Sequence, residues 1–126
     1  MIDHITFGIS DFNRSTKFYD RALGPLGLRR LFDDDSGPGK ATGYGDTRPW
    51  FWIAEHDPTR GMLHIAFAAG SREAVDAFHR EALSAGGRDN GEPGLRPDYH
   101  PGYYGAFILD PDGHNIEAVF HERSLA

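Results

Sequence analysis

The sequence predicts an α+β fold made of two βαβββ repeats. A segment near the amino terminus recurs in outline 60 residues later without a gap, and each copy passes from a strand pattern to a helix pattern and then to three further strand candidates. The identical pairs are His4 and His64, Ile5 and Ile65, Phe7 and Phe67, Phe18 and Phe78, Ala22 and Ala82, Leu23 and Leu83, and Gly27 and Gly87. The repetition predicts one domain over residues 1–126, with a first unit at about 1–57 and a second at about 61–126.

The first repeat opens with a strand over residues 2–9, in which apolar and polar side chains alternate. The apolar set faces the core, so His4 and Thr6 lie on the opposite face. Apolar side chains at helical spacing then predict a helix over residues 11–23, which Gly24-Pro25 ends. Three short strands separated by turn-forming residues are expected next, at 28–32, 40–45 and 50–54.

The second repeat follows the same order. Its opening strand, residues 62–69, places His64 on the same face as its counterpart in the first copy. Ser71 is a suitable N-cap for a helix that Gly86-Gly87 ends. The next strand is weak, because glycines and prolines interrupt it, whereas two clear strands flank the turn 110–113. Those two strands cover residues 103–109 and 115–121.

Composition limits the partners. The chain has no cysteine, so any metal ligands must be His, Asp or Glu. A net charge of -6 without a basic cluster argues against nucleic acid or an anionic membrane as partner and favours a small molecule. The first residues lack the features of a signal peptide and no apolar run reaches about 18 residues. We therefore expect a soluble cytoplasmic protein.

Three potential metal ligands share one sheet face. In the last strand Glu117 lies opposite the apolar set, on the face that carries His4 and His64. Two neutral imidazoles and one carboxylate form a facial triad, which leaves coordination positions open for a substrate. Taken alone, each residue is equally an ordinary strand residue, but their agreement in face and repeat position favours a metal site. Iron, manganese, nickel, cobalt and zinc all suit these ligands.

Aromatic and polar residues near this face are candidates for contact with substrate. Trp50 and Trp52 are expected to share a face of their strand and to form the wall of an apolar pocket, the alternative being core or dimer packing. Residues 98–104 have the composition of a loop over a cavity mouth. The predicted substrate-binding residues are Thr6, Trp50, Trp52 and Tyr104, and the predicted catalytic residues are Glu117, Tyr103, Tyr104 and His100.

These segments resemble the vicinal oxygen chelate superfamily, the group of glyoxalases, bleomycin resistance proteins and extradiol dioxygenases. The resemblance covers essentially the whole chain and is carried by residues 2–7, 63–67 and, most specifically, 107–117. It implies an eight-stranded, cup-shaped mixed sheet with the helices on its outer face, around a divalent metal that chelates two neighbouring oxygens of a small molecule. By position, the resemblance makes His4, His64 and Glu117 the ligands, and it implies a homodimer.

One departure bears on the activity. Trp52 aligns with Glu117 between the repeats, at the position where glyoxalase I carries a fourth ligand. Extradiol dioxygenases use two histidines and one glutamate, but typical members have two duplicated domains. The expected function is therefore a metal-dependent lyase resembling lactoylglutathione lyase, or an enzyme resembling extradiol dioxygenases. The alternatives are a metal-independent binding protein for an antibiotic-type ligand and a non-catalytic remnant. The cup forms within one chain or by exchange of units between two.

Overall fold

A computed structural model describes residues 1–122 of the chain, and residues 123–126, the end of the second predicted unit, lie outside the described residues. The expected order of elements is confirmed. The first unit contains β1 (Ile5–Gly8), α1 (Phe12–Leu23), the short 3-10 helix η1 (Gly24–Leu26), β2 (Arg29–Asp34), β3 (Ala41–Gly45) and β4 (Pro49–Ala54). The second contains β5 (His64–Ala68), α2 (Arg72–Ser84), β6 (Arg88–Leu95), β7 (Tyr103–Leu109) and β8 (Asn115–His121).

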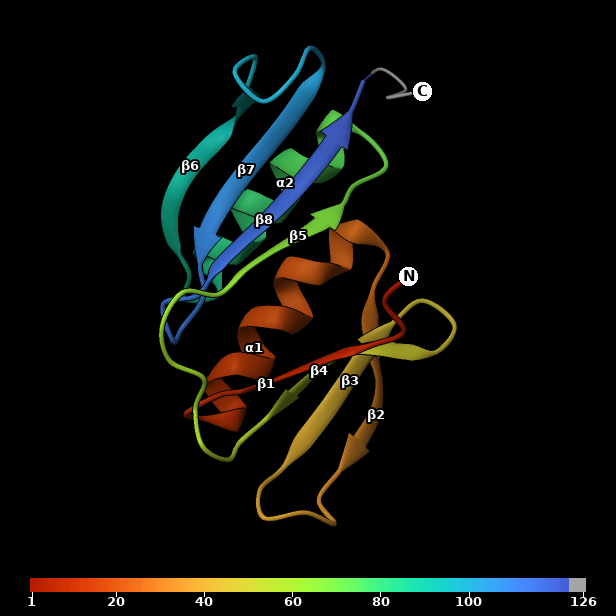
Figure 1. Ribbon diagram of the computed structural model, residues 1–126, viewed down its shortest axis with the longest axis vertical. Helices are drawn as coiled ribbons and strands as arrows, with labels where there is room; N and C mark the ends of the chain where they lie inside the picture. Colours follow the sequence, from red (N-terminus) through yellow and green to blue (C-terminus); the bar gives the residue numbers. More distant parts are fainter. Residues whose placement is uncertain (123–126) are drawn as a thin grey trace.

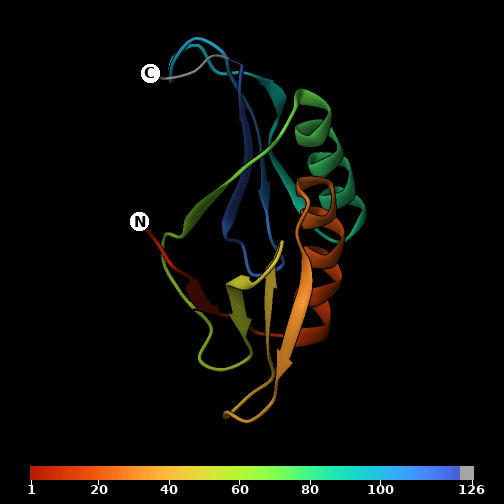
Figure 2. The same ribbon diagram turned by 90° about the vertical axis from the view of Figure 1, so that its right-hand side faces the viewer.

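Each unit forms a four-stranded mixed sheet, in the orders β1-β4-β3-β2 and β5-β8-β7-β6. In both sheets the opening strand pairs in parallel with the last strand, and the remaining pairs are antiparallel. The sheets follow one another along the long axis of the molecule (Figure 1), and both helices cover the same side of them (Figure 2). The opposite face of both sheets is therefore the face left for a site.

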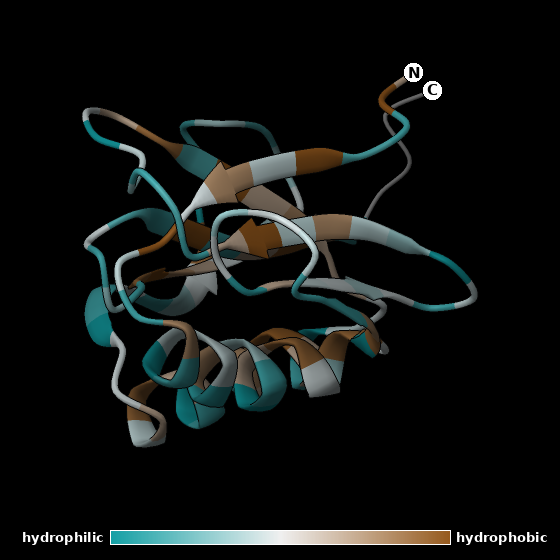
Figure 3. Cartoon of the chain, turned by 90° about the horizontal axis from the view of Figure 1, so that it is seen from below, coloured by the Kyte–Doolittle hydropathy of each residue, from teal (hydrophilic) through white to brown (hydrophobic). Residues whose placement is uncertain are grey.

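The core lies between the sheets and the helices. Capping fixes where each helix begins, because the side chains of Asp11 and Ser71 accept hydrogen bonds from the backbone N–H groups of Arg14 and Ala74. Each helix then turns apolar residues toward the strands, and Figure 3 shows helices and strands as two layers with hydrophobic and hydrophilic segments alternating along the helices. Burial of apolar side chains at helical spacing stabilises the two helices.

The two units share one core. The ring of Phe51 in β4 lies 5.0 Å from the ring of Phe67 in β5, and the hydroxyl of Tyr19 in α1 donates to the buried carboxylate of Asp110 at 2.5 Å. Burial is the main reason that the pKa of Asp110 is raised. Contacts of this kind hold the sheets at a fixed relative position.

The two units pair their opening and last strands in the same register. Thr6 in β1 pairs with Trp52 in β4, and Ala66 in β5 pairs with Glu117 in β8. Since residues 6 and 66 occupy the same position of the repeat, Trp52 and Glu117 are structural counterparts, as the sequence alignment of the repeats predicts.

Two details differ from the sequence-based expectation. The weak strand is β6, which is eight residues long and tolerates Pro93 and two register shifts because it lies at the edge of its sheet. Trp50 is the extra residue of a β-bulge, since Tyr44 pairs with Phe51 whereas Gly45 pairs with Pro49. No helix within residues 1–122 has the length and apolar character needed to cross a membrane.

Candidate metal centre

A buried carboxylate lies at the centre of the second sheet. Glu117 is 1% exposed, and its Oε1 accepts a hydrogen bond from Nε2 of His64 at 2.9 Å. Its Oε2 accepts a hydrogen bond from the hydroxyl of Tyr103. Both carboxylate oxygens are therefore engaged, which offsets the cost of removing the charge from water.

The phenol of Tyr103 is held in its protonated form. Burial raises the pKa of Tyr103 well above its ordinary value, and the hydrogen bond to Glu117 adds to this effect. Arg96 acts in the opposite direction, because its positive charge favours the phenolate. Tyr103 therefore donates a hydrogen bond to the carboxylate throughout the neutral range.

The geometry of His64 and Glu117 fits a metal ion. Two ligand atoms about 2.1 Å from one ion and at right angles to each other are about 3 Å apart. The 2.9 Å between Nε2 and Oε1 is close to that separation and is also the length of an ordinary hydrogen bond. The side chain of His64 is 38% exposed, so an ion in place of the Nε2 proton would remain open to a ligand from solution.

His4 has the orientation of a metal-ligating histidine but lies elsewhere. Its Nδ1–H donates to Oδ1 of Asp3 at 2.7 Å, and Arg48 donates to the other oxygen at 3.0 Å. This arrangement fixes the imidazole and leaves Nε2 free to bind an ion. The hydrogen bond from His4 is the main reason that the pKa of Asp3 is lowered.

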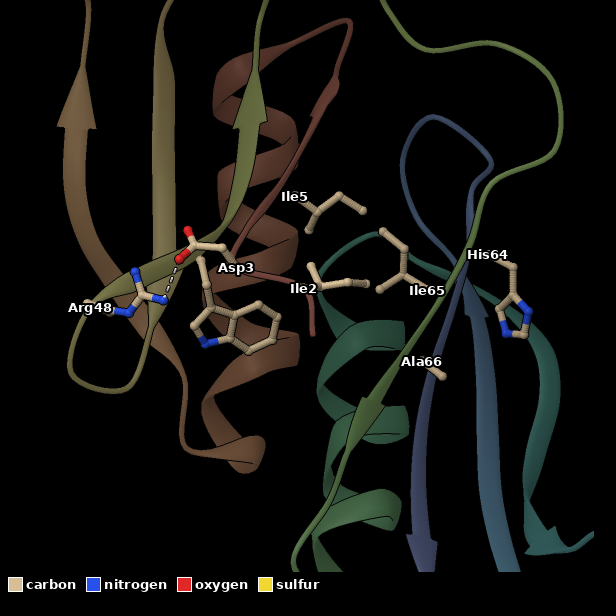
Figure 4. Close-up of a pocket in the computed structure, with 8 residues that line it drawn as sticks. Ile2, Asp3, Ile5, Arg48, His64, Ile65 and Ala66 are labelled. Carbon is tan, nitrogen blue, oxygen red and sulfur yellow. Dashed lines mark hydrogen bonds and ion pairs between the residues drawn. The ribbon is translucent and has the colours of Figure 1, made fainter.

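A cavity of about 540 Å³ separates the two ends of the predicted triad. It lies between the opening strands of the sheets, with Asp3 and Arg48 at one end and His64 at the other (Figure 4). His4 lies at the end of the cavity where Asp3 is, because its side chain is hydrogen-bonded to that of Asp3. Within residues 1–122 of a single chain, His4, His64 and Glu117 are thus not brought together as one metal-binding group.

The first sheet has a cavity on the face that the helices leave uncovered. Thr6 and Trp52 line a cavity of about 440 Å³ together with His4. The indole of Trp52 lies over Gly43, where a Cβ atom would be 2.7 Å from the ring. The first unit thus has the aromatic side chain of Trp52 at the position where the second unit has the carboxylate of Glu117.

Trp50 does not share this face, contrary to the expectation. Its ring packs 5.9 Å from that of Phe67 and lines the cavity between the sheets. The bulge at Trp50 breaks the alternation of side chains along β4, so the even spacing from Trp52 no longer places both indoles on one face.

Tyr104 and His100 also lie apart from the carboxylate. The hydroxyl of Tyr104 donates to Asp76 of α2 at 2.7 Å, on the helix side of the sheet. Successive residues of a strand face opposite sides, so only Tyr103 can reach Glu117. Nε2 of His100 lies 2.9 Å from Nδ1 of His121, at the far end of β8. The structure does not bring Tyr104 or His100 to the predicted site.

Sequence reasoning overlooked three side chains near the candidate ligands, those of Asp3, Phe107 and Arg96. Asp3 precedes His4 directly, and this adjacency of a carboxylate and a histidine was a usable signal. The ring of Phe107 lies 6.1 Å from that of His64, and the guanidinium of Arg96 lies against the same ring. No sequence signal indicates Arg96, because bulges in β6 remove the alternation on which such a prediction depends.

Comparison with known proteins finds a family model and solved structures of the same superfamily. Residues 1–118 match the model of the Glyoxalase/Bleomycin resistance protein/Dioxygenase superfamily. A glyoxalase/bleomycin resistance protein from Albidiferax ferrireducens is 32% identical, with 95% of this chain and 98% of that chain covered and a TM-score of 0.79.

Two more distant structures share the fold. The genomically encoded fosfomycin resistance protein FosX from Listeria monocytogenes is 22% identical, with coverage of 99% and 94% and a TM-score of 0.70. A variant of glyoxalase I from Zea mays is 19% identical, with 94% of this chain and 46% of that chain covered and a TM-score of 0.72.

Proposed function

This chain belongs to the glyoxalase/bleomycin resistance protein/dioxygenase superfamily, and from that premise we propose that it is a divalent-metal-dependent enzyme acting on a small molecule with two neighbouring oxygens. The observation that carries the proposal is the contact between His64 and the buried Glu117. The Nε2 atom of His64 and the Oε1 atom of Glu117 are spaced as two ligands of one ion could be. A solved complex of a FosX variant holds Mn(II) and a dihydroxypropylphosphonic acid, which is a metal and a vicinal diol in a related fold.

The ligands of the proposed centre come from two chains. His64 and Glu117 of one chain would hold the ion together with His4 of a second copy, because His4 of the same chain lies across the cavity between the sheets. The proposed protein is therefore a homodimer with two shared sites. Nitrogen and carboxylate ligands suit iron, manganese, nickel, cobalt or zinc.

The residues of the chain have separate roles in this proposal. The ion would supply Lewis acidity toward the chelating oxygens of the substrate. Tyr103 holds Glu117 in place through its hydroxyl, and Asp3 orients His4. Trp52 and Thr6 border the substrate from the first sheet. Lyase and oxygenase reactions are both consistent with this set.

The first test is elemental analysis of protein prepared without a histidine tag. About one transition metal per chain is expected, and His64→Ala should lose it because the ion is left with too few ligands. Absence of metal after reconstitution with each candidate ion would overturn the proposal.

A mixing experiment tests the sharing of sites. His4→Ala and Glu117→Gln should each bind little metal alone. If sites are shared, a heterodimer of the two variants has one site without substitutions and one site with both, so about one ion per heterodimer should return. If each site lies within one chain, mixing restores nothing.

One observation favours a second candidate function. The cavity between the sheets is lined largely by apolar side chains, those of Ile2, Ile5, Trp50 and Ile65. A metal-independent protein that binds an apolar small molecule would use such a cavity. Ligand affinity that is unchanged in His64→Ala and in the presence of a chelator would favour this function over the enzyme.

A further inference from the structure

A cation lies on the same sheet face as the candidate ligands. Phe107 in β7 pairs directly with Glu117 in β8, and directly paired residues of antiparallel strands project from the same face. The guanidinium carbon of Arg96 is 5.4 Å from the centre of the Phe107 ring, and the imidazole of His64 is 6.1 Å from it. One aromatic ring therefore contacts both the cation and a proposed metal ligand.

The backbone of β6 is shaped to hold this guanidinium. Nη2 of Arg96 donates to the carbonyl oxygen of Glu92 at 2.7 Å. A Cβ atom on Gly91 would be 3.3 Å from Nη2, and one on Gly94 would be 3.2 Å from Nη1. The two glycines lie at the register shifts of the strand. A Cβ atom at either position would require the guanidinium to shift by a few tenths of an ångström, so the two glycines leave room for the cation where it lies.

The charge of Arg96 has no carboxylate partner among residues 1–122. Ion pairs with Asp or Glu side chains are formed by Arg14, Arg21, Arg30, Arg48 and Arg72, whereas the guanidinium of Arg96 contacts a carbonyl oxygen and an aromatic ring. A half-buried guanidinium held by these two contacts keeps further donors available for a carboxylate or a phosphate, which it can bind through two parallel hydrogen bonds.

We propose that Arg96 binds an anionic group of the substrate, so that the natural ligand is a small acid carrying a carboxylate, phosphate or phosphonate besides its two neighbouring oxygens. This inference rests on the proposed function for the position of those oxygens. Arg96 is then a specificity-determining residue that selects acids over neutral molecules with the same chelating pair.

The test compares three ligands that share one ring: catechol, 3,4-dihydroxybenzoate and 3,4-dihydroxyphenylphosphonate. Their affinities are measured by anaerobic calorimetry with full-length protein, both metal-free and loaded with manganese. Arg96→Met removes the charge and keeps most of the stem. Arg88→Met is the matched control, at an exposed position of β6, the strand that ends one residue before Arg96.

In the wild type and in Arg88→Met, at least one of the two acids should bind at least tenfold more tightly than catechol. In Arg96→Met that margin should vanish while the affinity for catechol stays within about twofold. The two acids distinguish a carboxylate site from a phosphonate site. Equal affinities for acids and catechol in the wild type, or a margin that survives in Arg96→Met, would overturn the inference. If manganese changes none of the affinities but the margin is present, the metal proposal fails and the anion site stands.

Discussion

The hydroxyl of Tyr103 donates a hydrogen bond to one oxygen of the buried Glu117 carboxylate, and removal of that hydroxyl tests its role directly. Tyr103→Phe leaves Oε2 of the buried Glu117 without its donor, while the ring and its packing stay. An unsatisfied buried acceptor costs about 1–3 kcal/mol, so the free energy of unfolding in urea should fall by that amount. Metal affinity should fall as well, because Glu117 is less firmly oriented.

Tyr99 provides the control for this prediction. Its ring packs 4.9 Å from that of Tyr103, but it is 60% exposed and makes no contact with Glu117 in the described structure. Tyr99→Phe should leave stability within about 0.5 kcal/mol of the wild type. Equal losses in both variants would mean that the hydroxyl of Tyr103 has no particular role.

At the scale of secondary-structure elements, a close backbone approach holds the hairpin of β2 and β3 against the end of β4. A Cβ atom on Gly39 would lie 1.6 Å from the carbonyl oxygen of Glu55, and backbone atoms cannot move away as a side chain would. Gly39→Ala should therefore lower the free energy of unfolding by about 1–3 kcal/mol. Gly37→Ala is the control in the same loop, because a Cβ atom there meets nothing within 4 Å. Similar urea midpoints for the two variants would refute this explanation.

A second link between elements joins α2 to β6 and depends on pH. His79 is buried, and its Nε2 lies 2.9 Å from Oδ1 of Asp89. The hydrogen bond from His79 is the main reason that the pKa of Asp89 is lowered from 3.8. A lowered pKa in the folded state means that the carboxylate stabilises the fold above 3.8 and that this stabilisation is lost as the pH falls through the folded value.

Unfolding of the wild type and of Asp89→Asn should therefore be compared between pH 6 and pH 2. The stability advantage of the wild type is expected to be largest above pH 3.8 and to shrink as the pH falls further. Asp98→Asn, at an exposed residue, should show no such trend. An advantage that is constant down to pH 2 would argue against the carboxylate as its source.

Prediction from sequence succeeded where side chains alternate without interruption. The strands 103–109 and 115–121 and the helix cap at Ser71 follow local rules, so their positions were predicted closely. Trp50 was misplaced because a bulge shifts the alternation by one residue, and a bulge depends on pairing between strands. The distance between His4 and the His64–Glu117 pair depends on how the two sheets pack, which no repeat pattern within one chain specifies.

At the scale of the whole molecule, metal binding and association of chains should be thermodynamically linked. If an ion bridges His4 of one chain and His64 with Glu117 of another, it binds the dimer and not the separated chains. At an ion concentration 100 times its dissociation constant, each site would favour the dimer by about 2.7 kcal/mol.

Sedimentation at a series of protein concentrations, with and without a chelator, measures this linkage. Removal of the metal should shift dissociation to higher protein concentration, and His4→Ala should be insensitive to the chelator. A dimer whose dissociation constant is the same with and without metal would place the whole site within one chain.

The pairing of Trp52 with Glu117 across the repeats has a consequence for which end of a substrate reacts. A centre with true twofold symmetry would accept a ligand with two oxygens in either of two equivalent orientations. An indole on one side and a carboxylate on the other remove that equivalence, since only one side offers charge and only the other offers an apolar wall. A substrate bound between them is held one way round, so the reaction at the proposed centre is expected to act on one of the two chelating oxygens and not on the other.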